Sequence, residues 1–209
     1  MSNQTFDFDA KTTAQKEDIE WLRLWCEDTN ADLPRVALIG DSITEGYFPL
    51  VKDALKDAAR VDYLATSYAL TSPAYWKCIK SFVEDSDYKV IHFNYGLHAH
   101  HIDDDTYEEK CRAMLAFLRT QCEAVIVGNT TIVLNADLVT ESEHWQGKVA
   151  SRNDRLCRIA EDEGYPLNDL NILTRTLPSS AFKPDGVHLE RDGYAVLAAN
   201  VVDMIQQYL

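Results

Sequence analysis

The feature that most constrains the fold is a repeated alternation between short apolar runs and segments with helical periodicity. The short runs are rich in β-branched and large apolar residues and lie at 36–39, 61–64, 90–93 and 124–127. Continuous apolar runs of this length are typical of strands buried on both faces of a parallel sheet. The alternation therefore predicts an α/β fold of three layers, α/β/α, with right-handed crossovers between the strands.

The segments between these runs repeat apolar residues with the spacing of one helix face. They lie at 51–58, 76–83, 107–118, 149–160 and 194–205. The second of them follows a Ser-Pro pair, which is typical of an N-cap and the first helical position. Each segment is therefore predicted to be a helix that covers one face of the sheet.

One more helix is predicted before the first strand, over residues 12–30, where Ile19, Leu22 and Cys26 lie at helical spacing. We find no internal repeat, low-complexity tract or long linker in the sequence. Residues 1–209 are therefore predicted to form a single domain, with the N-terminal helix packed on its body. A chain of this length can bury a hydrophobic core of its own.

The charge balance bears on possible partners and location. Twenty basic and thirty-four acidic residues give a net charge of -14. Such a surface repels phosphate backbones and anionic membranes, so neither nucleic acid nor a membrane is expected as a partner. No apolar stretch reaches the roughly 18–20 residues that span a bilayer, and no signal peptide is visible. The five cysteines form no CxxC pair and are interpreted as small buried apolar residues of a cytoplasmic protein.

A serine follows the first predicted strand, where the run at 36–39 leads into Gly-Asp-Ser-Ile-Thr at 40–44. In an open α/β sheet, ligands bind beyond the carboxyl ends of the strands, where helix N-termini also point. Ser42 at this position can attack a carbonyl while its own backbone N–H helps to hold the oxyanion. Asp and Ser are also good N-caps, so this segment alone is equally typical of a simple helix start.

An aspartate and a histidine precede the last predicted helix, in the segment Lys-Pro-Asp-Gly-Val-His-Leu at 183–189. A serine hydroxyl needs a base to remove its proton, and histidine is the natural base at neutral pH. His188 in turn needs an acceptor at its other ring nitrogen, and Asp185 on the same turn can supply it. Pro-Asp-Gly is otherwise an ordinary turn sequence. Together with Ser42, the segment predicts a nucleophile, a base and an orienting carboxylate.

These two segments together resemble the SGNH/GDSL hydrolase family, from about Val36 to the C-terminus. The resemblance implies a flavodoxin-like α/β/α fold with a central parallel sheet and a triad of Ser42, His188 and Asp185. It also implies hydrolysis of small-molecule esters without a cofactor or a metal. The family includes lipases, thioesterases, and acetyl esterases that act on carbohydrates. We therefore expect a serine esterase for small acyl esters, with acetyl esters of carbohydrates as one candidate and the oligomeric state open.

The sequence departs from the family where the oxyanion hole should be completed. The family normally has a glycine after the second strand and an asparagine after the third. Here Ser67 follows the second strand, and its backbone N–H is the expected donor beside that of Ser42. Alignment on Gly96 puts His98 in the place of the asparagine, where a neutral imidazole with one N–H replaces the amide. Asn94 on the same loop is a second candidate.

The remaining expectations concern the substrate pocket and the alternative functions. Asn129 and Thr130, after the fourth strand, are expected to line the pocket together with Asp41. The altered oxyanion hole leaves open a ligand-binding protein with impaired chemistry. A cluster of His98, His100, His101 and Asp103–Asp105 contains metal-ligand types, so metal-dependent hydrolysis is a third hypothesis. We interpret the acidic run instead as the start of a helix and expect no metal.

Overall fold

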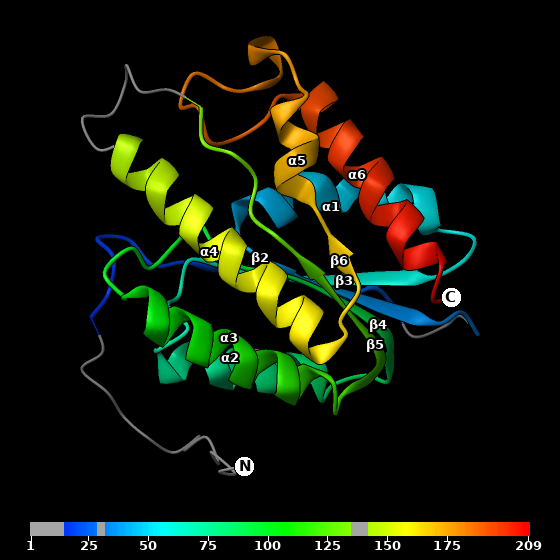
Figure 1. Cartoon of the computed structure of the whole chain (residues 1–209). Helices are drawn as coiled ribbons and strands as arrows, with labels where there is room; N and C mark the ends of the chain where they lie inside the picture. The colour runs from blue at the N-terminus through cyan, green and yellow to red at the C-terminus, as the bar shows by residue number, and fades with distance from the viewer. Residues whose placement is uncertain (1–14, 29–31, 135–141) are drawn as a thin grey trace.

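The computed structural model describes residues 15–28, 32–134 and 142–209. At its centre lies one six-stranded sheet with the strand order β1-β3-β2-β4-β5-β6 (Figure 1). β2 to β6 are parallel to one another, whereas β1 is antiparallel to its one neighbour in the order, β3. The strands are β1 (Leu22–Trp25), β2 (Arg35–Gly40), β3 (Arg60–Thr66), β4 (Tyr88–Asn94), β5 (Cys122–Gly128) and β6 (Leu167–Asn168).

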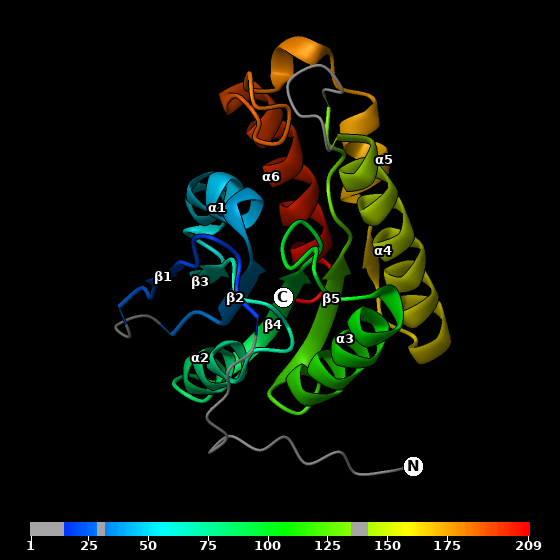
Figure 2. The same ribbon diagram turned by 90° about the vertical axis from the view of Figure 1, so that its left-hand side faces the viewer.

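Helices cover both faces of the sheet (Figures 1 and 2). One apolar core joins the sheet to α2, α3 and the C-terminal half of α4, and a second joins it to α1, α5 and α6. The arrangement is the three-layer α/β/α fold expected from the sequence, extended by the antiparallel strand β1. The helices are α1 (Ser42–Leu55), α2 (Pro73–Val83), α3 (Asp104–Leu118), α4 (Ser142–Glu163), α5 (Leu170–Arg175) and α6 (Arg191–Gln206).

All four predicted strands lie inside β2, β3, β4 and β5. Val36, Leu38 and Ile39 of β2 are fully buried, as expected for a strand covered on both faces. The predicted helical segments fall on α1, α2, α3, α4 and α6. α1 begins at Ser42, much earlier than its apolar pattern indicated, because the buried side chain of Asp41 caps it.

The helix predicted over residues 12–30 is wrong within the described part of that range. Leu22–Trp25 form the edge strand β1, which pairs with β3 from Leu22 opposite Thr66 to Trp25 opposite Tyr63. The side chains of β1 are exposed, so helical spacing of apolar residues reflects no buried face there. The backbone groups of β1 instead form hydrogen bonds with the edge of β3 that would otherwise be unpaired. Residues 12–14 and 29–30 lie outside the described residues.

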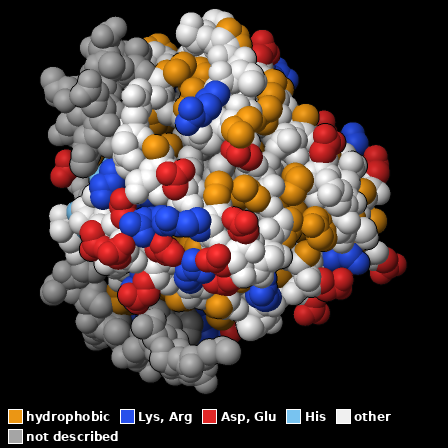
Figure 3. Space-filling model, viewed as in Figure 1, with side chains coloured by type: hydrophobic (Ala, Val, Ile, Leu, Met, Phe, Trp, Pro, Cys, Tyr) orange, Lys and Arg blue, Asp and Glu red, His pale blue; other side chains and the backbone are white. Residues whose placement is uncertain are grey.

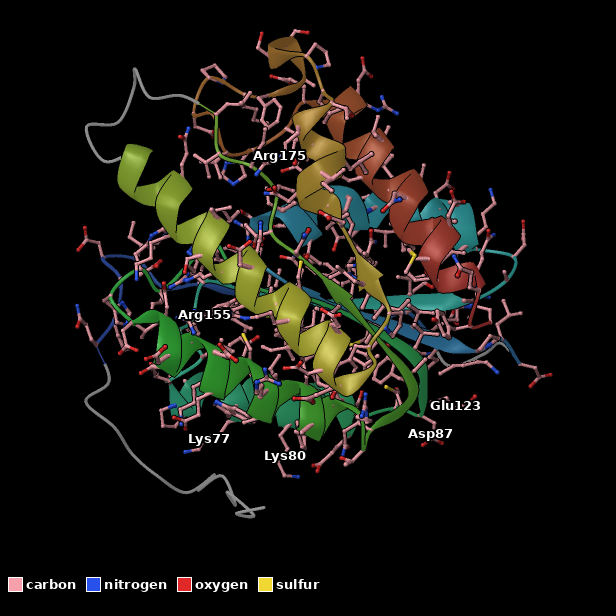
Figure 4. All side chains as sticks on the ribbon, in the orientation of Figure 1. Lys77, Lys80, Asp87, Glu123, Arg155 and Arg175 are labelled. Carbon is pink, nitrogen blue, oxygen red and sulfur yellow. The ribbon has the colours of Figure 1, made fainter. Side chains whose placement is uncertain are left out.

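Charged side chains join α3 to α4 on the face that Figure 3 presents, where acidic and basic groups alternate. Glu108 of α3 accepts from Arg112 on its own helix and from Arg155 of α4, whose position between the two helices is labelled in Figure 4. Arg112 also pairs with Asp162 and Glu163 near the end of α4. These contacts fix α4 along α3 and so determine where α4 meets the loop after β4.

The cysteines and the helix lengths bear on two further expectations. Cys111 is buried, whereas Cys26 is exposed and the other three are partly exposed, so the expectation of buried cysteines is right for Cys111 only. Within the described ranges, none of the helices combines the length and the apolar character that a membrane crossing requires.

Candidate active site

Ser42 is the first residue of α1 and lies two residues beyond Gly40, the carboxyl end of β2. Asp41 caps the helix, because its Oδ1 accepts a hydrogen bond from the Ile43 N–H at 2.9 Å. Gly40 makes the sharp turn possible: a Cβ there would lie 2.0 Å from the Thr44 hydroxyl oxygen. The turn leaves the Ser42 side chain partly exposed while Asp41 is buried. The local sequence therefore presents one hydroxyl at the helix N-terminus.

His188 and Asp185 meet Ser42 at this edge of the sheet, although His188 is 146 residues away in sequence. The Nε2 atom of His188 lies 2.8 Å from Ser42 Oγ, and its Nδ1 lies 2.8 Å from Asp185 Oδ2. The other oxygen of Asp185 accepts the backbone N–H groups of Val187 and His188, each at 2.9 Å. Gly186, at φ +69°, allows this tight turn. The three predicted residues thus form one continuous hydrogen-bonded chain.

The electrostatics of the loop favour an ionised carboxylate behind the imidazole. Partial burial acts to raise the pKa of Asp185, but the hydrogen bonds from the Val187 N–H and from His188 outweigh it, and the pKa lies below its usual value. An ionised acceptor at Nδ1 holds the tautomer whose Nε2 is free to take a proton from Ser42. This arrangement can generate a serine nucleophile.

A hollow of about 400 Å³ opens beside these residues. Two of its lining residues, Trp21 and Arg23, belong to residues 15–28, called here the N-terminal segment, which the sequence did not connect with the site. Arg23 of this segment pairs with Glu45 of α1 and lies 5.7 Å from the ring centre of Trp21. The lining residues are Trp21, Arg23, Ser42, Glu45, Gly46, His98, Lys183, His188 and Tyr194.

Gly46 is required by the close approach of Tyr194, since a Cβ at Gly46 would lie 2.1 Å from the Cζ atom of that ring. We expect Gly46→Ala to displace the ring and lower the free energy of unfolding by about 1–3 kcal/mol, measured by urea denaturation. The matched control is Gly147→Ala in α4, where a Cβ meets nothing within 4 Å. That exchange is expected to raise stability by about 0.5–1 kcal/mol. Equal effects of the two exchanges would contradict the packing argument.

Two of the predicted oxyanion donors are not available. The Ser67 N–H donates to the Trp21 carbonyl at 3.2 Å, because β1 and the residues before it cover the end of β3. Asn94 is buried, and its amide donates to the carbonyl oxygens of Gly128 at 3.3 Å and Asn129 at 2.7 Å. Asn94 therefore ties β4 to the end of β5. The predictions for Ser67 and for Asn94 are wrong.

His98 lines the hollow together with Ser42 and His188, and its part as an oxyanion donor stays a prediction. Its Nδ1 atom lies 2.9 Å from Oε2 of Glu17, and the Trp21 ring meets it edge-on at 6.0 Å between ring centres. Burial acts to lower the pKa of His98, but the hydrogen bond with Glu17 and the charge of Asp41 outweigh it and raise the pKa. Nothing in the local sequence around His98 indicates Glu17, which is 81 residues away.

The loop that carries His98 is also held from beneath by Arg152 of α4, which is fully buried. Its guanidinium donates to the carbonyl oxygens of Gly96, His98 and Ala99, at 2.9, 2.5 and 2.7 Å respectively. Ala99 has φ +59°, a left-handed conformation that costs a non-glycine residue on the order of 1–2 kcal/mol. Arg152 could not be singled out from the sequence, because one arginine on an amphipathic helix ordinarily faces solvent.

Asp41, Asn129 and Thr130 do not line this hollow, so the prediction that they do is wrong. Asp41 is 1% exposed and its Oδ2 has no partner among the described residues, and burial raises its pKa.

Asn129 and Thr130 are also buried, and the backbone that follows β5 forms hydrogen bonds with the amide side chains of Asn153 in α4 and Asn171 in α5. Asn129 donates to Asp169 and accepts from the Asn171 N–H, while the Thr130 N–H donates to Asn153. Asn129 lines a separate hollow of about 240 Å³.

The histidine and aspartate cluster after β4 has partners other than a metal. His100 stacks on Trp145 with 4.2 Å between ring centres, and its Nε2 lies 2.7 Å from the Leu97 carbonyl. Asp103 caps α3, and Asp104 accepts from Ser151 and Lys148. The interpretation of the acidic run as a helix start is confirmed. In the ranges for which side chains are described, no three His, Cys, Asp or Glu side chains converge as a metal site would require.

Comparisons with known proteins agree with this architecture. No family model and no curated protein sequence matches the chain. Among solved structures, an acetylxylan esterase from Geobacillus stearothermophilus is similar with a TM-score of 0.67 at 16% identity, covering 82% of this chain and 94% of its own. A lipase/acylhydrolase from Enterococcus faecalis gives 0.67 at 18%, covering 84% and 96%. The acetyl xylan esterase AlAXEase gives 0.66 at 19%, covering 82% and 99%. The chain therefore has the α/β/α fold of these proteins, and the predicted fold class is confirmed.

Proposed function

We propose that this protein is a serine esterase of the SGNH/GDSL type that hydrolyses small acyl esters. The observation that carries the proposal is the hydrogen-bonded chain from Ser42 Oγ through His188 to Asp185, open to a hollow at the carboxyl edge of the sheet. A helix cap alone would explain Ser42 but not the imidazole and carboxylate lined up behind it. Structures of the same fold include proteins described as esterases and as a lipase/acylhydrolase.

In the proposed reaction, Ser42 Oγ attacks the acyl carbon while its proton passes to His188 Nε2, and Asp185 stabilises the imidazolium. The tetrahedral oxyanion forms at the N-terminus of α1, where the Ser42 N–H has no helix carbonyl to bond. His98, on the wall of the same hollow, is the proposed side-chain donor. His188 then gives its proton to the leaving alkoxide, which leaves the acyl group on Ser42. A water molecule, deprotonated by His188, releases the carboxylic acid and restores Ser42.

For the substrate, we propose an acetyl ester of a carbohydrate. The hollow is small, at about 400 Å³, and its walls include Trp21 and Tyr194, which offer apolar faces of the kind that sugars contact. Two of the structures with this fold are described as acetyl xylan esterases. Acetate release from acetylated xylooligosaccharides, compared with release of butyrate and longer acids from matched esters, tests this choice. Faster release of the longer acids would contradict it.

A covalent probe tests the reaction class. We expect a fluorophosphonate to add one phosphonyl group to Ser42, because only a hydroxyl activated by a neighbouring base reacts readily with it. Intact-mass analysis should show the adduct on the wild type and not on Ser42→Ala. The control is Ser81→Ala, which removes an exposed hydroxyl of α2 and should leave labelling unchanged. A ligand bound in the hollow without any adduct on the wild type would indicate a binding protein instead.

A further inference from the structure

The carboxylate of Glu17 holds the loop that carries His98 at two points. Its Oε2 lies 2.9 Å from His98 Nδ1, and its Oε1 accepts the backbone N–H of Ala99. The segment that carries Glu17 is itself fixed on the end of β3. The Trp21 N–H donates to Ser67 Oγ at 2.9 Å, and the Trp21 carbonyl accepts from the Thr66 hydroxyl at 2.6 Å. Glu17 is thus part of a built structure beside the hollow.

The loop is fixed on its other side as well. The buried Arg152 donates to the carbonyl oxygens of His98 and Ala99, while Glu17 engages the side chain of His98 and the N–H of Ala99. These contacts hold the left-handed backbone of Ala99 in place. The imidazole of His98 is therefore positioned, rather than free to rotate, on the wall that it shares with Ser42 and His188.

The contact with Glu17 decides which form of His98 can donate. A carboxylate at Nδ1 keeps a proton on that nitrogen, so a neutral ring presents only a lone pair at Nε2. A lone pair cannot stabilise an oxyanion. The charged imidazolium, in contrast, carries an N–H at Nε2 as well as a positive charge. The neutral imidazole donor expected from the sequence is therefore inconsistent with this contact.

We propose that Glu17 is a positioning residue that holds His98 as an imidazolium, whose Nε2–H is the side-chain donor to the oxyanion formed when Ser42 attacks the ester. The inference rests on the proposed esterase function and assigns the N-terminal segment a part in it. The proton on His98 stays in place throughout the reaction, whereas that on His188 is transferred.

The charges around His98 agree with this assignment. Glu17 of the N-terminal segment and Asp41 at the start of α1 favour the imidazolium, whereas burial and Arg152 of α4 oppose it; His100 on the same loop also interacts with His98. The balance raises the pKa of His98. The donor form is therefore present below this raised pKa and is lost as the pH rises through it. We expect the rate to fall on the basic side of the pH profile.

The test is the pH profile of kcat/KM for phenyl acetate with Glu17→Gln. Glutamine keeps an acceptor oxygen but removes the charge, so the basic limb should move to lower pH. Beyond that limb the rate should fall toward that of an enzyme without one oxyanion donor, on the order of 10²-fold below the wild type. The matched control is Glu27→Gln on the same segment, whose carboxylate bonds the Val61 N–H and Lys52 away from the hollow. Its profile should follow the wild type, and a basic limb that stays in place in Glu17→Gln overturns the proposal.

Two further measurements separate this inference from the esterase function. An NMR titration can follow the His98 ring, whose signals are assigned by comparison with His98→Asn. In the wild type the ring should stay charged over the active pH range, and in Glu17→Gln it should lose its charge at a lower pH. A neutral His98 in that range overturns the proposal even if Ser42 is labelled and turns over esters. If Glu17→Gln does not fold, His98→Asn serves in its place, since its neutral amide should abolish the basic limb. Absence of both labelling and turnover in the wild type overturns the esterase function and this inference together.

Discussion

Replacing Ser42 with alanine is expected to lower kcat for phenyl acetate by roughly 10⁴–10⁶-fold, the range seen when a member of a catalytic triad is removed. The exchange deletes one hydroxyl that lies 2.8 Å from His188 Nε2 and leaves the Asp41 cap of α1 in place. Binding and the remaining oxyanion donors are expected to leave a small residual rate. Steady-state kinetics on the purified variant measures the effect.

Two comparisons make the expected loss specific to the nucleophile. In thermal denaturation, the Tm of Ser42→Ala should lie close to that of the wild type, because the side chain that is removed is partly exposed. Ser81→Ala should retain full activity. If Ser42→Ala hydrolysed phenyl acetate within about tenfold of the wild type, covalent catalysis by Ser42 would have to be abandoned.

The features that could be predicted from the sequence are those that depend on residues close together in the chain. The strand β2 is readable because Val36 to Ile39 are buried on both faces, which requires an unbroken apolar run. Ser42 is marked by the turn at Gly40, and Asp185 lies on the same tight turn as His188. Each of these features is determined by residues within a few positions of one another.

The parts that the sequence did not predict depend on which distant group takes each hydrogen bond. The N–H of Ser67 lies at a position typical of an oxyanion hole, but it donates to the carbonyl oxygen of Trp21, just before the strand that pairs with the outer edge of β3. Asn94 has the right chemistry, yet its amide is used by carbonyl oxygens at the end of β5. Leu22 lies at helical spacing from Ile19 and Cys26, but it is an exposed residue of an edge strand. The pairing of an edge strand depends on backbone groups, which a pattern of apolar residues does not reveal. Glu17 and His98 are paired only by tertiary structure.

Replacing Asp185 with asparagine is expected to lower kcat/KM on the order of 10⁴-fold, because it reverses the tautomer of His188. The asparagine oxygen is expected to take over the N–H groups of Val187 and His188, as Oδ1 of the aspartate does. Its NH₂ group then faces His188 Nδ1, which must become an acceptor, so the ring proton moves to Nε2. A protonated Nε2 donates to Ser42 and cannot remove its proton.

The control for this exchange is Asp192→Asn, which removes a similar charge from the first turn of α6 and should leave the rate nearly unchanged. Fluorophosphonate labelling of Ser42 should slow in parallel with ester turnover in Asp185→Asn, since both need the same base. This loss of rate differs from the effect of Glu17→Gln, which should shift the basic limb of the pH profile without lowering kcat/KM at pH values below that limb. A fall of less than about tenfold in Asp185→Asn would show that the loop, rather than the carboxylate, orients His188. In that case Asp185 would act mainly through the two N–H groups that its Oδ1 accepts.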